Sequence, residues 1–174
     1  NEIYLFGVKR GSGETIWDLR KKIGLVSWKL HNEYRYFGGL TVEQVIVSGI
    51  HDSIGLYEQC GDFEKNLVNQ WLGISTLHIN KTDHFGNLSY GEQRAVLILR
   101  AAVKLPEILI LDEPCLGLDY EQQQIIAELL DQIAEQKLST LLHVTHNPKE
   151  SLSCEHHILE FNPQQKPMYR ILTR

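Results

Sequence analysis

Two adjacent carboxylates follow one of the most apolar segments of the chain. Residues 108–111 read Ile-Leu-Ile-Leu, and Asp112 and Glu113 come next, before Pro114. Four successive apolar residues predict a buried strand, and ligands of open α/β sheets bind at the carboxyl ends of strands. There Asp112 could hold Mg²⁺ directly or through water, and Glu113 could orient or deprotonate a water that attacks a phosphate. The alternative is a strand that ends in a solvated acidic turn.

A second pattern, Ser89-Tyr90-Gly91-Glu92, fits the S-x-x-E capping box and predicts a helix that begins after Ser89. The free N–H groups and partial positive charge of a helix N-terminus can bind a phosphate. Gly91 would let the backbone approach that phosphate closely. An ordinary helix cap explains the same residues, so both interpretations stay open.

Two further residues stand where predicted elements meet. His146 follows a predicted strand at 140–144, and Asp119 ends the turn Leu-Gly-Leu-Asp before a predicted helix, where it could act as the N-cap. A histidine at a strand end can equally be structural or solvated. His143 points to the opposite strand face, so the two histidines do not predict a metal pair.

The elements that would position these residues alternate along the chain. We expect a strand at 3–7, a Gly-rich loop at 9–14, a helix at 16–22, a buried strand at 23–27, and helices at 41–50, 63–72 and 89–105. These are followed by a strand at 108–111, a helix at 121–136, a strand at 140–144, a short helix from Pro148 and a strand pair at 157–161 and 168–172. This alternation predicts an α/β fold, mostly a parallel sheet with helices on both faces, and a helical subdomain insert.

Two of the predicted helices carry an apolar face. For 63–72 it comprises Phe63, Leu67, Val68, Trp71 and Leu72, and for 121–136 it comprises Ile125, Ile126, Leu129, Leu130 and Ile133. We expect both faces to pack against the core.

Composition narrows the class of protein. The chain has 174 residues, 43% hydrophobic and 22% charged, which is typical of a globular domain. A formal charge of −5 and a pI near 5.9 argue against a nucleic-acid surface, and no nucleic-acid-binding motif is visible. Three widely spaced cysteines predict reduced thiols rather than disulfides or a zinc site. No apolar run approaches the roughly 20 residues of a membrane span, and no signal peptide is visible, so we expect a cytoplasmic location.

Taken in order, these patterns resemble the ATP-binding cassette (ABC) ATPase family, a P-loop NTPase-like fold. The resemblance implies ATP and Mg²⁺ as cofactors. It makes Asp112 the Walker B aspartate that holds Mg²⁺, Glu113 the catalytic glutamate, and His146 the switch histidine that contacts the γ-phosphate. These three residues would serve the nucleotide held by their own cassette.

The same resemblance implies a second cassette, head to tail, as the partner. Ser89 and Gly91 would lie in the signature loop and serve the nucleotide of that partner, and Asp119 would be the D-loop aspartate that couples the two sites. The family pattern divides the chain into 1–40, a partial ATPase core with the Q-loop region, 41–104, a helical subdomain with the signature helix, and 105–174, the core with Walker B, D-loop and H-loop.

Residues 11–19, 23–31 and 52–57 more closely resemble the second cassette of the ModF (PhrA-like) group, tandem cassettes labelled for molybdate transport. This resemblance implies an ATP-hydrolysing cassette coupled to molybdate, an oxyanion, through a membrane permease, at the inner face of the membrane. Two alternatives stay open: a soluble tandem-cassette ATPase without a transporter, and a non-hydrolytic fragment that serves as an interaction surface.

The family's phosphate-binding loop, G-x-x-x-x-G-K-[ST], is absent, and the chain contains no Gly-Lys dipeptide. We expect that loop upstream of Asn1, which makes the cassette N-terminally incomplete and inactive by itself. A missing strand beside 108–111 would also leave an apolar edge. Three residues depart from the family pattern: Trp28 replaces the usual Gln of the Q-loop, Tyr90 a Gly of the signature, and Glu92 a Gln.

Overall fold

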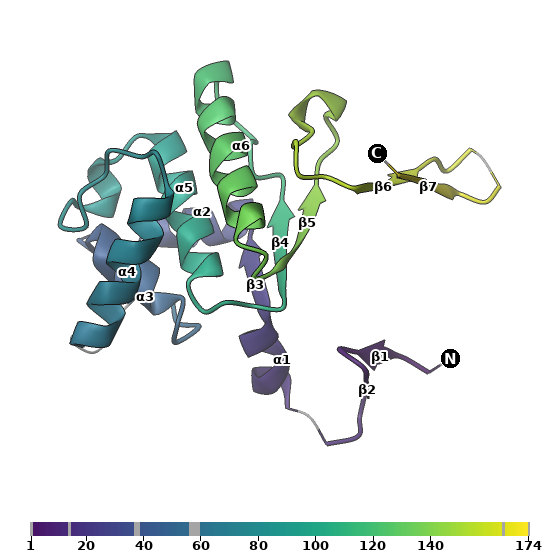
Figure 1. The fold of residues 1–174 in the computed structure, drawn as a ribbon, viewed down its shortest axis with the longest axis horizontal. Coiled ribbons are helices and arrows are strands. Elements are labelled where there is room, and N and C mark those ends of the chain that lie inside the picture. The colour runs from purple at the N-terminus through teal and green to yellow at the C-terminus, as the bar shows by residue number, and fades with distance from the viewer. Residues whose placement is uncertain (1, 14, 37–38, 56–59, 165, 174) are drawn as a thin grey trace.

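The structure is a computed structural model that describes every residue except 1, 14, 37–38, 56–59, 165 and 174. Its centre is a parallel three-stranded sheet of β3 (Ile23–Val26), β4 (Ile108–Asp112) and β5 (Thr140–Val144), in that order (Figure 1). The helices are α1 (Ile16–Lys22), α2 (Trp28–Tyr36), α3 (Val42–Ser48), α4 (Asp62–Ile74), α5 (Tyr90–Ala102) and α6 (Tyr120–Glu135), with 3₁₀ turns η1 (Phe85–Asn87) and η2 (Pro148–Glu150). Two antiparallel hairpins project away from the sheet (Figure 1). One pairs β1 (Tyr4–Leu5) with β2 (Val8–Lys9), and the other pairs β6 (His157–Phe161) with β7 (Tyr169–Thr173).

Strand β4 lies in the middle of the sheet, and this order sets where the site forms. Ile23 pairs with Ile108, and Asp112 pairs with Val144, so the carboxyl ends of the three strands meet at one edge. The expectation of an exposed edge beside 108–111 is therefore wrong. β3 and β5 flank β4 on its two sides, and they form the free edges of the described sheet.

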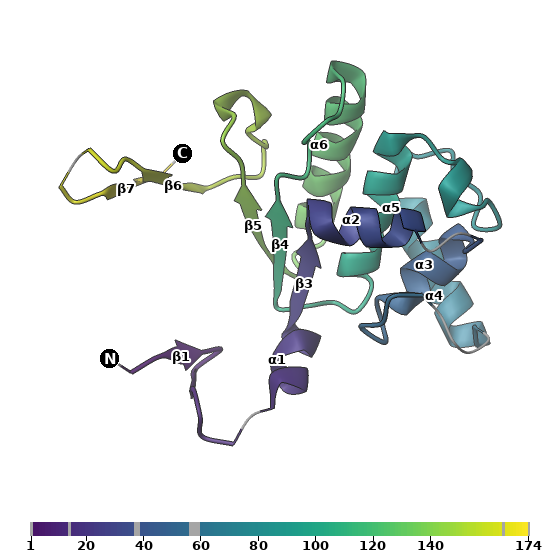
Figure 2. The same ribbon diagram turned by 180° about the vertical axis from the view of Figure 1, so that it is seen from behind.

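Helices α5 and α6 cover one face of the sheet, as the two opposite views show (Figures 1 and 2). On that side Leu109 and Leu111 are fully buried. The opposite face is largely open in the part of the chain that the structure describes, because Leu25, Leu142 and Val144 are 48%, 46% and 43% exposed. The apolar strands predicted helices on both faces, as is usual for parallel sheets. The described helices cover only one face of this sheet, so the prediction of helices on both faces is wrong for the described residues.

Helix α5 is the centre of the core. It begins at the Ser89 cap and stays buried from Gln93 to Ala102, because α3, α6, α2 and β3 all pack around it. A helix that is buried on every side needs apolar residues all round, and the run from Ala95 to Leu99 supplies them. Two arginines, Arg94 and Arg100, are buried in the same helix.

Most predicted elements are confirmed within a residue or two, and α1, β5 and β6 have the predicted bounds. The segment 3–7 is a short strand and a tight turn, in which Phe6 and Gly7 have φ values of 50° and 77°. Glu14 of the predicted loop, and Leu56 and Tyr57 of the segment 52–57, lie outside the described residues.

Two residues were wrongly placed on apolar faces. Phe63 is 76% exposed and Ile125 is 39% exposed. At about 100° per residue, Phe63 lies about 140° around α4 from the buried Val68, and Ile125 lies about 100° from the buried Ile126. None of the described helices is long and apolar enough to cross a membrane.

Candidate functional site

The ends of β4 and β5 bring a carboxylate and an imidazole into contact. The ladder continues one residue past the strands, because the Glu113 N–H donates to the Val144 carbonyl at 2.9 Å. Beyond it, Glu113 Oε1 accepts hydrogen bonds from the His146 backbone N–H at 3.1 Å and from His146 Nδ1 at 2.6 Å. The structure therefore brings together two of the residues that the sequence singled out, 33 positions apart in the chain.

This contact changes the electrostatics of the histidine. The hydrogen bond to Glu113, and then its negative charge, raise the pKa of His146 above its ordinary value. Glu113 itself has φ 50°, a left-handed conformation that costs energy for a residue other than glycine. Strained backbone of this kind is concentrated at functional sites. The pair can hold and release a proton at the sheet edge.

Asp112 lies next to this pair and is exposed to solvent. Carboxylate oxygens are the ligands that Mg²⁺ prefers, and Mg²⁺ is commonly bound by one or two carboxylates together with substrate phosphates. No cluster of three or more potential metal ligands is found among the described residues. The donor set therefore fits an Mg²⁺ ion that the phosphates of a substrate help to hold, rather than a metal enclosed by protein ligands.

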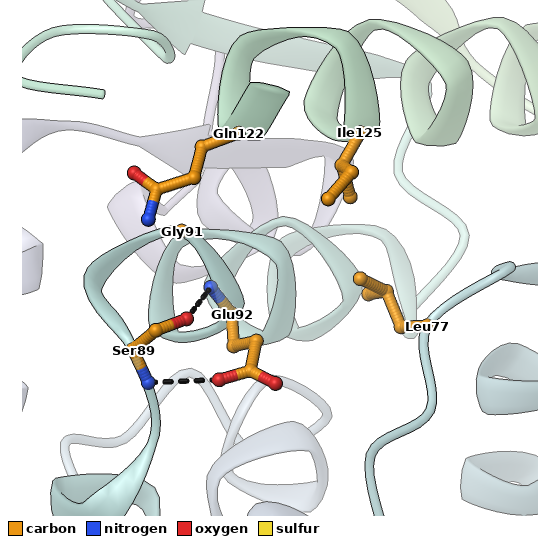
Figure 3. Close-up of a pocket in the computed structure, with 6 residues that line it drawn as sticks. All are labelled: Leu77, Ser89, Gly91, Glu92, Gln122 and Ile125. Atoms are coloured by element: carbon orange, nitrogen blue, oxygen red, sulfur yellow. Dashed lines mark hydrogen bonds between the residues drawn. The ribbon is translucent and has the colours of Figure 1, made fainter. Parts of the chain in front are cut away.

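The capping box at the start of α5 forms as the sequence predicted. The Glu92 N–H donates to Ser89 Oγ at 3.3 Å, and the Ser89 N–H donates to Glu92 Oε2 at 2.8 Å (Figure 3). Ser89, the N-cap of this helix, is exposed. Gly91, in contrast, is buried.

Gly91 lies at a close approach between α5 and α6. A Cβ atom there would lie 3.0 Å from Cγ and 3.1 Å from Cδ of Gln122, the residue above it (Figure 3). Gln122 belongs to the first turn of α6, and its N–H donates to Asp119 Oδ1 at 2.9 Å. Asp119 is thus the N-cap of α6, as predicted, and Gln122 joins the Asp119 turn to the start of α5. A cavity of about 30 Å³ lies between them.

Gln122 is a residue that the sequence analysis missed, since no motif marks it. The six predicted site residues fall into two groups. Asp112, Glu113 and His146 lie at the sheet edge, whereas Ser89, Gly91 and Asp119 gather where α5 and α6 begin.

Other conspicuous residues have structural surroundings. Burial raises the pKa of the Cys115 thiol to about 11, so it is not a reactive thiolate. Cys60, Cys115 and Cys154 are free, in agreement with the prediction of reduced thiols. Trp28 begins α2 and is 54% exposed. Tyr90 stacks on His31, with ring centroids 4.3 Å apart.

Parallel strands that end in an Asp-Glu pair and a histidine, beside a capped Ser-x-Gly helix start, define a nucleotide-binding domain of the ATPase-cassette class. A family model described as "ABC transporter" matches residues 3–116. The chain belongs to this family of ATP-binding cassettes, whose members hydrolyse ATP, which confirms the family suggested by the sequence.

Similar proteins support the same family. The chain is 45% identical over its whole length to "ABC transporter ATP-binding protein ModF" of Escherichia coli, of which it covers 35%. It is 34% identical to "Zinc uptake system ATP-binding protein ZurA" of Listeria innocua, over 92% of this chain and 60% of that protein. The chain thus spans between about a third and two thirds of the length of these relatives.

Solved structures share the fold. The dimeric structure of MJ0796, named as a bacterial ABC transporter cassette, has a TM-score of 0.66 and 24% identity, and covers 91% of this chain and 67% of that one. A dimeric post-hydrolysis state of the same cassette, bound to ADP and Pi, has a TM-score of 0.65. The predicted α/β cassette fold is confirmed.

Proposed function

We propose that this chain forms the hydrolytic part of an ABC ATPase and acts on ATP gripped by a phosphate-binding loop outside these 174 residues. The observation that carries the proposal is the contact between Glu113 Oε1 and His146 Nδ1 at the carboxyl ends of adjacent parallel strands. This is the edge at which open α/β sheets bind ligands. The sequence itself contains no phosphate-binding loop, so the nucleotide needs further residues to hold it.

Each residue then has a chemical task. Glu113 orients a water at its carboxylate and accepts a proton from it as the water attacks the γ-phosphate, the bond between the γ-phosphorus and the bridging oxygen breaks, and ADP leaves. His146 leaves Glu113, turns toward the phosphate and keeps it in line. Asp112 would help to hold Mg²⁺, which neutralises charge on the phosphates.

The second group serves a second nucleotide. The exposed Ser89 hydroxyl and the N–H groups of the first turn of α5, including that of Gly91, would bind phosphate oxygens presented by a partner cassette. Asp119, the N-cap of α6, would meet that partner and couple the two sites. We propose the head-to-tail cassette pair on this basis. The dimeric state of the MJ0796 cassettes supports it.

We further propose the subdomain division 1–40, 41–104 and 105–174, a cytoplasmic location, and coupling to a membrane permease that imports molybdate. The greater identity to ModF than to ZurA favours the ModF group over a zinc system. Copurification of the longer protein with a permease, and permease-dependent molybdate uptake, would support this transport role.

A soluble tandem ATPase without a permease is the second candidate. It is favoured by one observation, namely that the chain covers only 35% of the ModF relative, so a second cassette fits in the remainder of such a protein. ATP hydrolysis with no permease partner would favour this function. Failure of the longer protein to bind nucleotide would instead leave only an interaction role.

The test of the hydrolytic proposal compares steady-state phosphate release by the 174-residue chain and by a longer chain that contains the phosphate-binding loop. We expect hydrolysis only from the longer chain. Equal rates would contradict the proposal.

A further inference from the structure

The loop that carries His146 is tied together by one carboxylate, that of Glu150. Thr145 and Asn147 lie on either side of His146, between the end of β5 and the 3₁₀ turn η2. Glu150 Oε2 accepts a hydrogen bond from the Thr145 hydroxyl at 2.7 Å, and Glu150 Oε1 accepts one from Asn147 Nδ2 at 3.1 Å. Each oxygen of the carboxylate therefore holds one of the two neighbours of His146. None of the functional steps described above uses these three side chains.

Further hydrogen bonds close the same loop. The Asn147 N–H donates to Thr145 Oγ1 at 3.0 Å, so this hydroxyl accepts one hydrogen bond and donates another. The Glu150 N–H donates to the Asn147 carbonyl at 3.0 Å, and the Lys149 N–H donates to Asn147 Oδ1 at 3.2 Å. Threonine and asparagine side chains fix short turns by bonds of this kind to nearby backbone groups. The backbone around His146 is thereby held at both of its flanking residues.

The ring of His146 depends on this loop for its place. Its side chain is 75% exposed, and among the described residues its ring has one hydrogen bond, to Glu113. In the proposed reaction the ring leaves Glu113 and turns toward the γ-phosphate, so this hydrogen bond cannot hold the ring during that step. The backbone on each side of His146 then sets where the ring can reach.

The sheet alone does not hold this backbone. The ladder between β4 and β5 ends where the Glu113 N–H donates to the Val144 carbonyl. Beyond Val144, the chain is held by the side chains of Glu113, which accepts from the His146 N–H, and of Glu150. Hydrogen bonds to an ionised carboxylate are about twice as strong as those between neutral groups, so Glu150 is suited to this task.

We propose that Glu150 is a positioning residue for His146. Its carboxylate fixes Thr145 and Asn147, which keeps the His146 backbone in place while the ring exchanges Glu113 for the γ-phosphate. Glu150 itself touches neither nucleotide nor water in this step. This inference rests on the proposed function, because it concerns a histidine that acts in ATP hydrolysis.

ATP hydrolysis by the longer protein tests the proposal, with Glu150→Ala as the variant and Glu155→Ala as the matched control. Glu155 is also a partly buried carboxylate that follows β5, but it contacts His143 Nδ1, at 2.9 Å, instead of the neighbours of His146. We expect Glu150→Ala to lower kcat about tenfold or more with KM for ATP within about twofold, because the ring is misplaced while nucleotide binding is kept. Glu155→Ala should leave kcat within about twofold of wild type.

Two further variants separate positioning from a loss of folded protein. Glu150→Gln keeps an oxygen for Asn147 Nδ2 and offers an N–H to Thr145 Oγ1, so it should restore kcat to within about threefold of wild type. In His146→Ala protein, adding Glu150→Ala should leave the single-turnover rate of phosphate release unchanged, because no ring is left to position. An equal fall in both backgrounds, or a kcat loss in Glu155→Ala as large as that in Glu150→Ala, would overturn the inference.

A second readout does not depend on turnover. The amides of His146 and Asn147 both donate hydrogen bonds, so their hydrogen exchange should speed up about fivefold or more in Glu150→Ala and keep the wild-type rate in Glu155→Ala. Unchanged exchange in Glu150→Ala would contradict the inference. If the wild-type longer protein hydrolyses ATP and Glu150→Ala retains its kcat, this inference alone fails. If the wild-type longer protein hydrolyses no ATP, the proposed function itself fails, and the inference fails with it.

Discussion

Replacement of Glu113 by glutamine tests the proposed base while it preserves the shape of the site. In the wild-type protein the His146 backbone N–H donates to Glu113 Oε1 at 3.1 Å. A glutamine oxygen can still accept this hydrogen bond, but a carboxamide cannot take a proton. General-base catalysis contributes about 10²–10⁴-fold, or about 2.7–5.4 kcal/mol at about 1.36 kcal/mol per tenfold. We expect kcat of the longer protein to fall by that factor. ATP binding should persist and the closed cassette pair should accumulate.

The assay is steady-state phosphate release at saturating ATP and Mg²⁺, with size-exclusion chromatography to detect the closed pair. Glu121→Gln is the matched control, because Glu121 is an exposed carboxylate in the first turn of α6. This substitution removes the same charge as Glu113→Gln but lies outside the Glu113–His146 contact. The Glu121→Gln control should unfold at the wild-type temperature. Turnover of Glu113→Gln within about threefold of the control would refute the role of Glu113 as the base.

Three other perturbations have defined outcomes. Glu113 raises the pKa of His146 above its ordinary value of 6.5. The pair therefore stabilises the fold fully below pH 6.5, and this contribution is lost as the pH rises through the raised pKa. NMR titration of Glu113→Gln should show the pKa of His146 returning toward 6.5. Gly49→Ala places a Cβ 1.9 Å from the Arg100 carbonyl oxygen, so α3 and α5 must separate, and urea unfolding should show a loss of about 3 kcal/mol. Asp119→Ala removes the α6 cap and should cost about 1 kcal/mol in the same assay, and a wild-type unfolding midpoint in urea would contradict it.

Local signals made much of this fold predictable. The apolar run before Asp112 and the capping box at Ser89 depend on residues close in sequence, and the structure has the strand and the helix start that they predict. The caps at Ser89 and Asp119 depend on the same short-range chemistry. These predictions needed no knowledge of which strands are neighbours.

Contacts between distant residues were not predictable. From the sequence we expect the strand beside 108–111 to be missing, and no local pattern shows that β5 pairs with β4 there. This strand order places His146 against Glu113. The contact of His31 with Gln93 joins residues 62 positions apart. Gln122 appears in no motif, yet its side chain is the nearest neighbour that a Cβ atom at position 91 would meet.

The central claim is that the Asp112 and Glu113 carboxylates face a triphosphate that other residues grip. A crystal structure of the longer protein carrying Glu113→Gln, with ATP and Mg²⁺, tests this most directly. We predict that Asp112 reaches Mg²⁺ directly or through one water, and that residue 113 lies beside a water in line with the γ-phosphate. Side chains at 112 and 113 that point away from the bound nucleotide would contradict the account.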